Sequence, residues 1–218
     1  MIHSNSDKPR IINVMASSID GFVAVNDGQT DEERHYQGFT TSDDRHHLDE
    51  LIRSADAILL GSRTMATANG ALDVSKEDGT YPVWITFTNR GIPEDNGFWR
   101  QPHIPRWTIS HQPLKSHQPD VLNFSYGEEN LVDFTMHLLE SHGFSRVLLF
   151  GGGEVNRLFY EQHAVDELIV TICPILVASS NGVPIVNPGI QSPIQMDLIS
   201  LKQQNNLIFA HYTIRKEI

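Results

Sequence analysis

The segment Arg146-Val-Leu-Leu-Phe-Gly-Gly-Gly-Glu-Val-Asn156 leads from a short apolar run into three consecutive glycines, and a helix-like segment at residues 155–161 follows. Glycine lets the backbone turn tightly and approach a ligand without a side-chain clash. The unpaired N–H groups at the start of a helix favour an anion such as phosphate. The segment therefore predicts a strand, a turn and a helix that together form an anion cradle.

This glycine run matches neither of two well-known phosphate loops. It lacks the Gly-x-Gly-x-x-Gly spacing of the ordinary dinucleotide loop and the Gly-Lys-Ser/Thr ending of the P-loop. The alternative is a connection whose glycines only allow close packing of the strand against the helix. Glu154 favours this alternative, because a carboxylate beside the loop repels phosphate. The segment by itself leaves both interpretations open.

Size and composition predict one soluble domain. The chain has 218 residues, of which 39% are hydrophobic and 20% are charged, as in ordinary globular proteins. We expect residues 1–10 to form a flexible tail and residues 11–218 to form the domain. The tail lacks the apolar stretch of a signal peptide, and no run is long enough to cross a bilayer. These features predict a cytoplasmic protein without a membrane role.

Charge and cysteine content exclude several classes of partner. The net charge is −11 without a basic block, which argues against nucleic acid because its phosphates require clustered Lys and Arg. A single cysteine, Cys173, rules out an internal disulfide and a Cys-based metal cluster. The densest histidine cluster, His46-His47, consists of neighbours that point about 100° apart on a helix and cannot easily share one ion. We expect no metal site.

Apolar runs bounded by turn residues predict five buried strands, at residues 11–16, 57–60, 83–87, 147–150 and 168–177. Amphipathic helices are predicted at residues 42–54, with Ser42 as the N-cap, and at residues 130–141. This alternation indicates an α/β protein with a mostly parallel central sheet and helices on both faces. Residues 195–200 and 207–214, joined by a polar turn at 201–206, predict a C-terminal antiparallel hairpin. Residues 69–80 and 91–105 are expected to be loops.

Four motifs occur in a fixed order: Ala16-Ser-Ser-Ile-Asp-Gly21, Asp56-Ala-Ile-Leu-Leu-Gly-Ser-Arg-Thr64, Gly151-Gly-Gly153 and Val165-Asp-Glu-Leu168. Together they resemble the C-terminal reductase domain of the riboflavin-biosynthesis bifunctional deaminase-reductases, from about Ile11 to the C-terminus. The resemblance implies a dihydrofolate-reductase-like fold, a homodimer and NADPH as the cofactor. It also implies the activity of a 5-amino-6-(5-phosphoribosylamino)uracil reductase, which transfers hydride to the ribosyl moiety of a small-molecule substrate. The chain has no Pro-Cys-x-x-Cys motif of the zinc deaminases, so only reduction is implied.

Position by position, the resemblance assigns the cofactor site more fully than the substrate site. The residues implied to bind NADPH are Ala16, Phe39, Thr64, Thr88, Gly151, Gly152, Gly153, Glu154, Val155 and Asn156. In this set the three glycines face the pyrophosphate. Thr88, together with Arg63 or Arg90, meets the 2′-phosphate.

On the substrate side, Arg53 and Leu72 match substrate-contacting positions of the family. Three positions depart from its pattern, because Val14, Phe150 and Ser75 stand where the family has Lys, Glu and Arg. Either neighbours such as Arg45, His46 and Lys76 compensate for the lost contacts, or the pocket accepts a less charged molecule.

Asp20 is the ionisable group nearest the first strand in these motifs and is the candidate proton donor. Its alternative role is structural, since Asp-Gly favours a tight turn.

Two classes of function follow from this reading. The first is a reductase, acting on the pyrimidine or on another heterocycle or carbonyl such as a pterin. The second is a module that binds the cofactor without turnover, which the three departures from the substrate pattern suggest.

Overall fold

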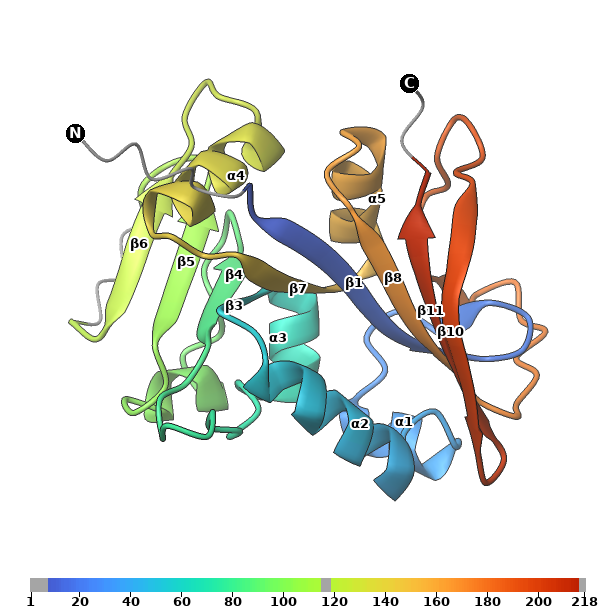
Figure 1. Ribbon diagram of the computed structural model, residues 1–218. Coiled ribbons are helices and arrows are strands. Elements are labelled where there is room, and N and C mark those ends of the chain that lie inside the picture. The colour runs from blue at the N-terminus through green and yellow to red at the C-terminus, as the bar shows by residue number, and fades with distance from the viewer. Residues whose placement is uncertain (1–7, 115–118, 216–218) are drawn as a thin grey trace.

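A computed structural model describes residues 8–114 and 119–215, which form an α/β fold around one nine-stranded sheet (Figure 1). The strands follow the spatial order β10-β11-β8-β1-β7-β3-β4-β5-β6. Their bounds are β1 (Arg10–Ser17), β3 (Ala57–Gly61), β4 (Val83–Phe87), β5 (Arg106–Ser110), β6 (Val121–Ser125), β7 (Arg146–Gly151), β8 (Glu167–Ile172), β10 (Met196–Gln204) and β11 (Leu207–Ile214). All pairs from β8 to β6 are parallel, whereas β11 runs antiparallel to β8 and β10. The predicted parallel sheet with a C-terminal hairpin is confirmed.

Helices cover both faces of the sheet (Figure 1). On one side lie α1 (Asp31–Tyr36), α2 (Ser42–Arg53) and α3 (Ser62–Ala68), and on the other lie α4 (Leu131–Ser141) and α5 (Gly153–Glu161). Each side has its own core, one built around Ile52, Met65 and Trp84 and the other around Leu139 and Phe159. A short 3-10 helix, η1 (Gly97–Arg100), and a separate strand pair, β2 (Phe22–Ala24) with β9 (Val183–Pro184), complete the fold.

Element boundaries differ from the predictions at the N-terminal side of the fold. Strand β1 begins at Arg10, one residue before the start of the predicted strand, and Pro9 before it is buried. The N-cap of α2 is Thr41 rather than Ser42. Thr41 keeps an extended backbone, with φ −115°, and its hydroxyl accepts the N–H of Asp44 at 3.2 Å, which makes Ser42 the first helical residue.

Two further boundaries differ near the C-terminus. Strand β8 ends at Ile172 instead of continuing to 177, and Pro174 follows, which has no N–H to donate to a sheet. The predicted turn at 201–206 is mostly strand, since β10 pairs with β11 as far as Gln204 opposite Leu207. Two residues are enough to reverse the chain here because Asn205 adopts φ 53°.

Two neighbouring strands, β3 and β7, determine where a site can form. They pair in parallel, and each ends in a glycine that leads directly into a helix, Gly61 into α3 and Gly151 through Gly152 into α5. A side chain at position 61 would place its Cβ 3.1 Å from Val155 Cγ2, so glycine allows the two helix starts to approach each other. Carboxyl ends of parallel strands meet at one edge of a sheet, and both helix N-termini open there.

Candidate active site

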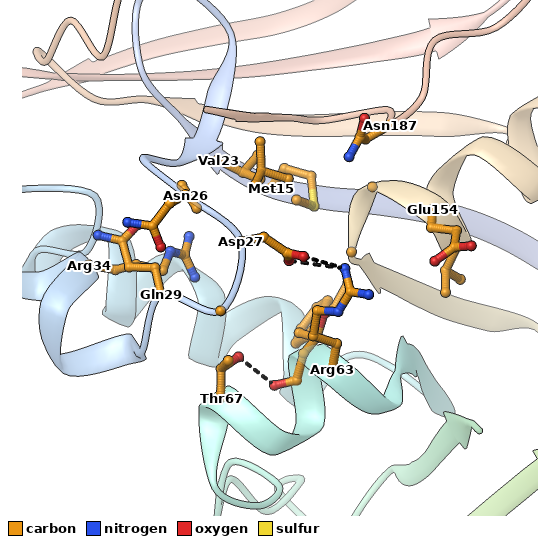
Figure 2. Close-up of a pocket in the computed structure, with 18 of the residues that line it drawn as sticks. Met15, Val23, Asn26, Asp27, Gln29, Arg34, Arg63, Thr67, Glu154 and Asn187 are labelled. Atoms are coloured by element: carbon orange, nitrogen blue, oxygen red, sulfur yellow. Dashed lines mark hydrogen bonds and ion pairs between the residues drawn. The ribbon is translucent and has the colours of Figure 1, made fainter. Parts of the chain in front are cut away.

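A cavity of about 370 Å³ opens at the paired starts of α3 and α5 (Figure 2). Its lining includes Arg63 and Thr64 from α3 and Gly152 to Val155 from the glycine turn and α5. Neither helix has a side-chain hydrogen bond at its N-cap. The first N–H groups of a helix have no acceptor within the helix, and together with the helix dipole they favour negative charge. This first cavity therefore has the features of an anion site.

The three glycines of the turn have different roles. Gly153 packs against protein, because a Cβ there would lie 2.8 Å from Asn187 Cβ and 3.1 Å from the Pro184 carbonyl. Gly151 also packs against protein, with φ 79° and a Cβ position 3.0 Å from the amide of Asn156. Gly152 differs, since its only close neighbour would be Thr64 Oγ1 at 3.3 Å. In this turn Gly151 and Gly153 allow close packing, whereas Gly152 leaves space for a ligand. The Gly151–Gly152 peptide bond is cis.

A buried polar network fixes this turn to the sheet. Asn156 donates to the Ile185 carbonyl at 2.7 Å and accepts from Asn13 Nδ2 at 3.1 Å. Asn13 in turn donates to the Leu149 carbonyl and accepts from the Tyr160 hydroxyl. Buried polar groups are costly when unpaired, so the network holds α5 against β1 and β7. The side chain of Asn156 is fully engaged in this contact rather than turned towards the cavity.

Opposite charges meet across the first cavity. Asp27, from the loop between β2 and α1, accepts two hydrogen bonds from Arg63 Nη1, at 3.0 and 2.8 Å, as Figure 2 shows. Both side chains are mostly exposed, and exposed ion pairs contribute little to stability. Arg63 can therefore exchange Asp27 for an anionic ligand at a small cost in free energy. Glu154, in the first turn of α5, also lines this cavity and is exposed.

A second cavity, of about 580 Å³, adjoins the first. The two share five lining residues, which are Met15, Asp31, Arg34, Thr64 and Phe150. Apolar side chains such as Leu48, Leu72 and Trp84 form part of its wall. A ligand in the first cavity can thus meet a second ligand across a common wall.

Asp44 is a buried carboxyl group in the wall of the second cavity. Its side chain is on α2, and the residue is only 7% exposed. Burial raises the pKa of the Asp44 carboxyl above its usual value, against the opposing effects of a hydrogen bond from Thr171 and the nearby charges of Arg34, His47 and Arg45. Burial also lowers the pKa of His47, one turn further along α2. Perturbed acids and bases in a cavity are typical of functional sites.

The structure brings together about half of the residues that the sequence suggested. The first cavity is lined by Thr64, Phe150, Gly152, Gly153, Glu154 and Val155, and the second by Val14, Ala16, Thr64, Leu72 and Phe150. Seven others lie outside the lining of both cavities: Phe39, Arg53, Ser75, Thr88, Gly151, Asn156 and Asp20. The suggested neighbours divide in the same way, since Arg63 and Arg45 line a cavity and Arg90, His46 and Lys76 do not.

Most residues outside the cavities have clear structural contacts. Phe39 is fully buried, and its carbonyl accepts from Cys173 Sγ at 3.3 Å. The Thr88 hydroxyl donates to the Gly91 carbonyl at 2.8 Å. Arg53 is exposed in the last turn of α2. None of these three residues lines either cavity.

Asp20 has the geometry of a turn residue. Its carboxylate accepts from Ser18 Oγ at 2.7 Å and from the N–H groups of Val177 and Ala178 at 3.1 and 2.8 Å. These hydrogen bonds, that of Ser18 first, lower the pKa of Asp20 to about 2. The group is ionised at neutral pH, so its contacts match the structural alternative better than proton donation.

Several cavity residues escaped the sequence analysis. Asp27 and Arg34 come from the segment around α1, Trp84 and Asp44 come from a predicted strand and a predicted helix, and Asn187 comes from a segment with no predicted role. A capping box, with Thr30 and Glu33 bonding each other's backbone, marks the start of α1. The pattern Thr-x-x-Glu was a usable signal for this helix.

The described residues contain neither a cluster of metal ligands nor a membrane-spanning helix. Within residues 8–114 and 119–215, no three His, Cys, Asp or Glu side chains come together as metal ligands would. In the same ranges, none of the helices has the length and apolar character needed to cross a membrane.

Comparisons with known proteins identify the family of this chain. A family model, the RibD C-terminal domain, matches residues 9–209. The 2,5-diamino-6-ribosylamino-4(3H)-pyrimidinone 5′-phosphate reductase of Aquifex aeolicus is 24% identical over 183 residues, which are 80% of this chain and 81% of that protein.

Two solved structures show the fold. A deaminase/5-amino-6-(5-phosphoribosylamino)uracil reductase from Thermotoga maritima superposes with a TM-score of 0.77 at 15% identity, covering 95% of this chain; the chain spans 57% of that protein. The dihydrofolate reductase of Enterococcus faecalis, solved with NADP(H), gives a TM-score of 0.52 at 11% identity over 96% of this chain and 99% of that one. The fold is therefore dihydrofolate-reductase-like, and the chain belongs to the RibD C-terminal domain family.

Proposed function

We propose that this protein is an NADPH-dependent reductase that transfers hydride to a ribosylaminopyrimidine-like heterocycle. One observation carries the proposal: the uncapped start of α5 opens on a cavity that shares a wall with a second, larger cavity. Adjoining sites are what a hydride donor and its acceptor need, because the reacting atoms must come within contact distance. The family relationship supports a reductase, and the relative from Aquifex aeolicus is named for such a substrate.

The residues of the first cavity fit a dinucleotide phosphate. The N–H groups of Gly153, Glu154 and Val155, in the first turn of α5, would hold the pyrophosphate. Gly152 leaves room above them that a Cβ would fill. Arg63 supplies the cation for a 2′-phosphate, and it replaces Thr88 and Arg90 in that role because they do not line the cavity. Bound there, NADPH supplies the hydride.

The chain's own contribution to the reaction is placement and a proton. The wall between the two cavities includes Met15, Thr64 and Phe150. These side chains would position the cofactor and the substrate against each other. We assign the proton-donating role in the second cavity to Asp44, because it lines that cavity and burial raises the pKa of its carboxyl group. It takes the place of Asp20, whose exposed carboxylate stays ionised.

Two alternatives keep specific support. A reductase of another heterocycle, such as a pterin, is supported by the altered positions Val14 and Phe150, which line the second cavity as apolar groups. A cofactor-binding module without turnover would bind NADPH and oxidise it with no related compound. Titration with NADPH followed by a screen of pyrimidines and pterins for NADPH oxidation distinguishes all three.

We also propose a homodimer that forms through the C-terminal edge strand β10. Leu198, Ile199 and Leu201 on this strand are each more than half exposed, and an edge strand offers unpaired backbone groups to a partner. A second copy of the chain, docked on β10, would cover both these apolar side chains and the unpaired backbone groups of the strand.

Gly152→Val is expected to weaken NADPH binding without unfolding the protein. The backbone at Gly152, with φ −70°, accepts a side chain, and the added methyl groups occupy the space over the start of α5. Calorimetry should show the affinity falling by more than about tenfold, equivalent to 1.4 kcal/mol. Gly189→Val is the matched control, because a Cβ there meets nothing within 4 Å. Equal NADPH affinities in the two variants would contradict the cradle.

Arg63→Gln should weaken NADPH by about tenfold or more and leave NADH nearly unchanged, because a charge-assisted hydrogen bond contributes about 1.5–3 kcal/mol. Parallel titrations with the two nucleotides measure this difference. Arg90→Gln removes an exposed arginine outside the cavity and serves as the control. If Arg90→Gln lost the preference for NADPH and Arg63→Gln kept it, the assignment of the 2′-phosphate would be wrong.

The carboxyl groups of Asp43 and Asp44 should change the stability of the protein in opposite directions as the pH rises. The raised pKa of Asp44 means that its stabilising contribution is present at low pH and is lost as pH rises from about 4 through the folded pKa. The pKa of Asp43 is lowered, chiefly by hydrogen bonds from Asn205 and Gln204, so its contribution is lost as pH falls below about 4. Denaturation between acid and neutral pH should therefore show Asp44→Asn gaining relative stability as pH rises, whereas Asp43→Asn does not. Parallel curves for wild type and Asp44→Asn would remove the proton-holding role.

Leu201→Glu should convert the dimer to a monomer, because a buried unpaired carboxylate at an interface is costly. Light scattering after size exclusion measures the mass. Ser200→Glu adds the same charge at the next position of the strand, on its other side, and should leave the dimer intact. A monomeric wild-type protein would refute the proposed assembly.

A further inference from the structure

Asp27 and Arg63 form an ion pair at the first cavity, and neither side chain has another hydrogen bond or ion pair with the residues that the structure describes. Both carboxylate oxygens of Asp27 accept from Arg63 Nη1, and Figure 2 shows the two side chains pointing toward each other. The Arg63 side chain is 67% exposed and that of Asp27 is 63% exposed. An ion pair so open to solvent contributes little to folding, so the stability of the fold does not account for this pairing.

The loop that carries Asp27 is held in shape by other contacts. It joins β2 to α1, and Gly28 in its turn has φ 87°, a conformation that favours glycine. Gln29 is only 6% exposed; its Oε1 accepts from the Val25 N–H at 3.0 Å, and its Nε2 donates to Gln37. Asp27 therefore projects from a turn that keeps its shape without the ion pair.

Carboxylates already occupy the arginines of the first cavity. Among the described lining residues, Asp27 pairs with Arg63, and Asp31 lies 3.6 Å from Arg34. Glu154 adds a further negative charge in the first turn of α5. A phosphate that enters this cavity therefore competes with a carboxylate of the protein for each guanidinium group.

The 2′-phosphate of NADPH and the Asp27 carboxylate need the same donors. A guanidinium group binds a phosphate and a carboxylate through the same fork of N–H groups, so Arg63 cannot serve both fully. A phosphate monoester carries a charge of about −1.5 to −2 at neutral pH, whereas a carboxylate carries a single negative charge. The phosphate is the stronger partner, but breaking the existing pair reduces its net gain.

We propose that Asp27 is a specificity-determining residue that competes with the 2′-phosphate of the cofactor for Arg63. In the free protein the Asp27 carboxylate holds the guanidinium group, and NADPH displaces it on binding. NADH has a hydroxyl group at the 2′-position and leaves the pair intact. The competition lowers the affinity for NADPH alone and narrows the difference between the two cofactors. This inference rests on the proposed function, in which Arg63 meets the 2′-phosphate.

Calorimetry of Asp27→Asn with NADP⁺ and NAD⁺ tests the competition. The variant keeps the size of the side chain and removes its charge. NADP⁺ should bind about three- to fivefold more tightly than it binds wild type, the range that an exposed ion pair allows, and the affinity for NAD⁺ should change by less than about twofold. An unchanged ratio of the two dissociation constants overturns the proposal.

Glu154→Gln is the matched control, because it removes one negative charge from the same cavity at a side chain that is not paired with Arg63. Both cofactors carry the pyrophosphate that is proposed to lie at the start of α5. Both should therefore bind somewhat more tightly, with the ratio of their dissociation constants within about twofold of the wild-type value. If Glu154→Gln and Asp27→Asn changed this ratio equally, the net charge of the cavity would explain the effect and the competition would be refuted.

The Arg63→Gln background separates competition from direct repulsion. A double-mutant cycle measures the coupling between two positions. If Asp27 acts by holding Arg63, adding Asp27→Asn to Arg63→Gln should change the NADP⁺ affinity by less than about twofold. A gain as large as that in the wild-type background would mean that the carboxylate repels the phosphate directly, which contradicts the proposed role.

Crystal structures with and without NADP⁺ provide an independent measurement. The bond between Asp27 and Arg63 should be present in the free protein and absent in the complex, where Arg63 should contact the 2′-phosphate. A protein that binds neither NADP⁺ nor NAD⁺ refutes the proposed function together with this inference. A complex with NADP⁺ in which Arg63 is still bonded to Asp27 refutes only the inference.

Discussion

The close approach of β3 and β7 determines the rest of the site. Parallel pairing places their carboxyl ends side by side, and glycine at the end of each strand lets α3 and α5 begin without a side chain between them. Two helix starts then face one cavity, and neither is closed by a capping side chain. In most helices a Ser, Thr, Asp or Asn side chain satisfies the first N–H groups. At α3 and α5 the first N–H groups have no capping side chain and remain available to a ligand. The close approach of the two backbones therefore creates the site where an anion could bind.

The packing role of the glycine run and its proposed binding role belong to different residues. Gly151 and Gly153 are required by neighbours within the protein, and Asn156 ties the turn to Asn13. Gly152 faces the cavity. A turn that must present amide groups to a phosphate has to be rigid, because an ordered ligand contact loses less entropy when the loop is already fixed. The packing role therefore serves the proposed binding role instead of excluding it.

Apolar periodicity predicted the parallel core of the fold, since β1, β3, β4 and β7 are continuous apolar runs that are buried on both faces. The outer strands were missed for physical reasons. Strand β5 begins with Arg106, which is buried because it donates to the Phe98 and Ile104 carbonyls and pairs with Asp120. Strand β6 lies at the sheet edge with Leu122 half exposed, so it lacks a clean apolar pattern. In the sequence, a strand that begins with a charged residue and a strand with exposed apolar side chains both have the mixed pattern of a loop.

The candidate site was predictable only where the chain itself carries the signal. Glycine next to a helix start is local, and four cavity residues in that turn were found from it. The environment of Asp44 is not local: Asp43 and Asp44 look alike in the sequence, yet Asn205 reaches one from the hairpin and Thr171 reaches the other from β8.

Which of two neighbouring aspartates becomes a cavity acid is thus decided by distant strands. The same holds for Trp84, whose indole has an apolar neighbour in Phe150, with the ring centroids 5.9 Å apart. Phe150 comes from β7, so the part of the cavity wall that these two rings form depends on strands that are separate in the sequence.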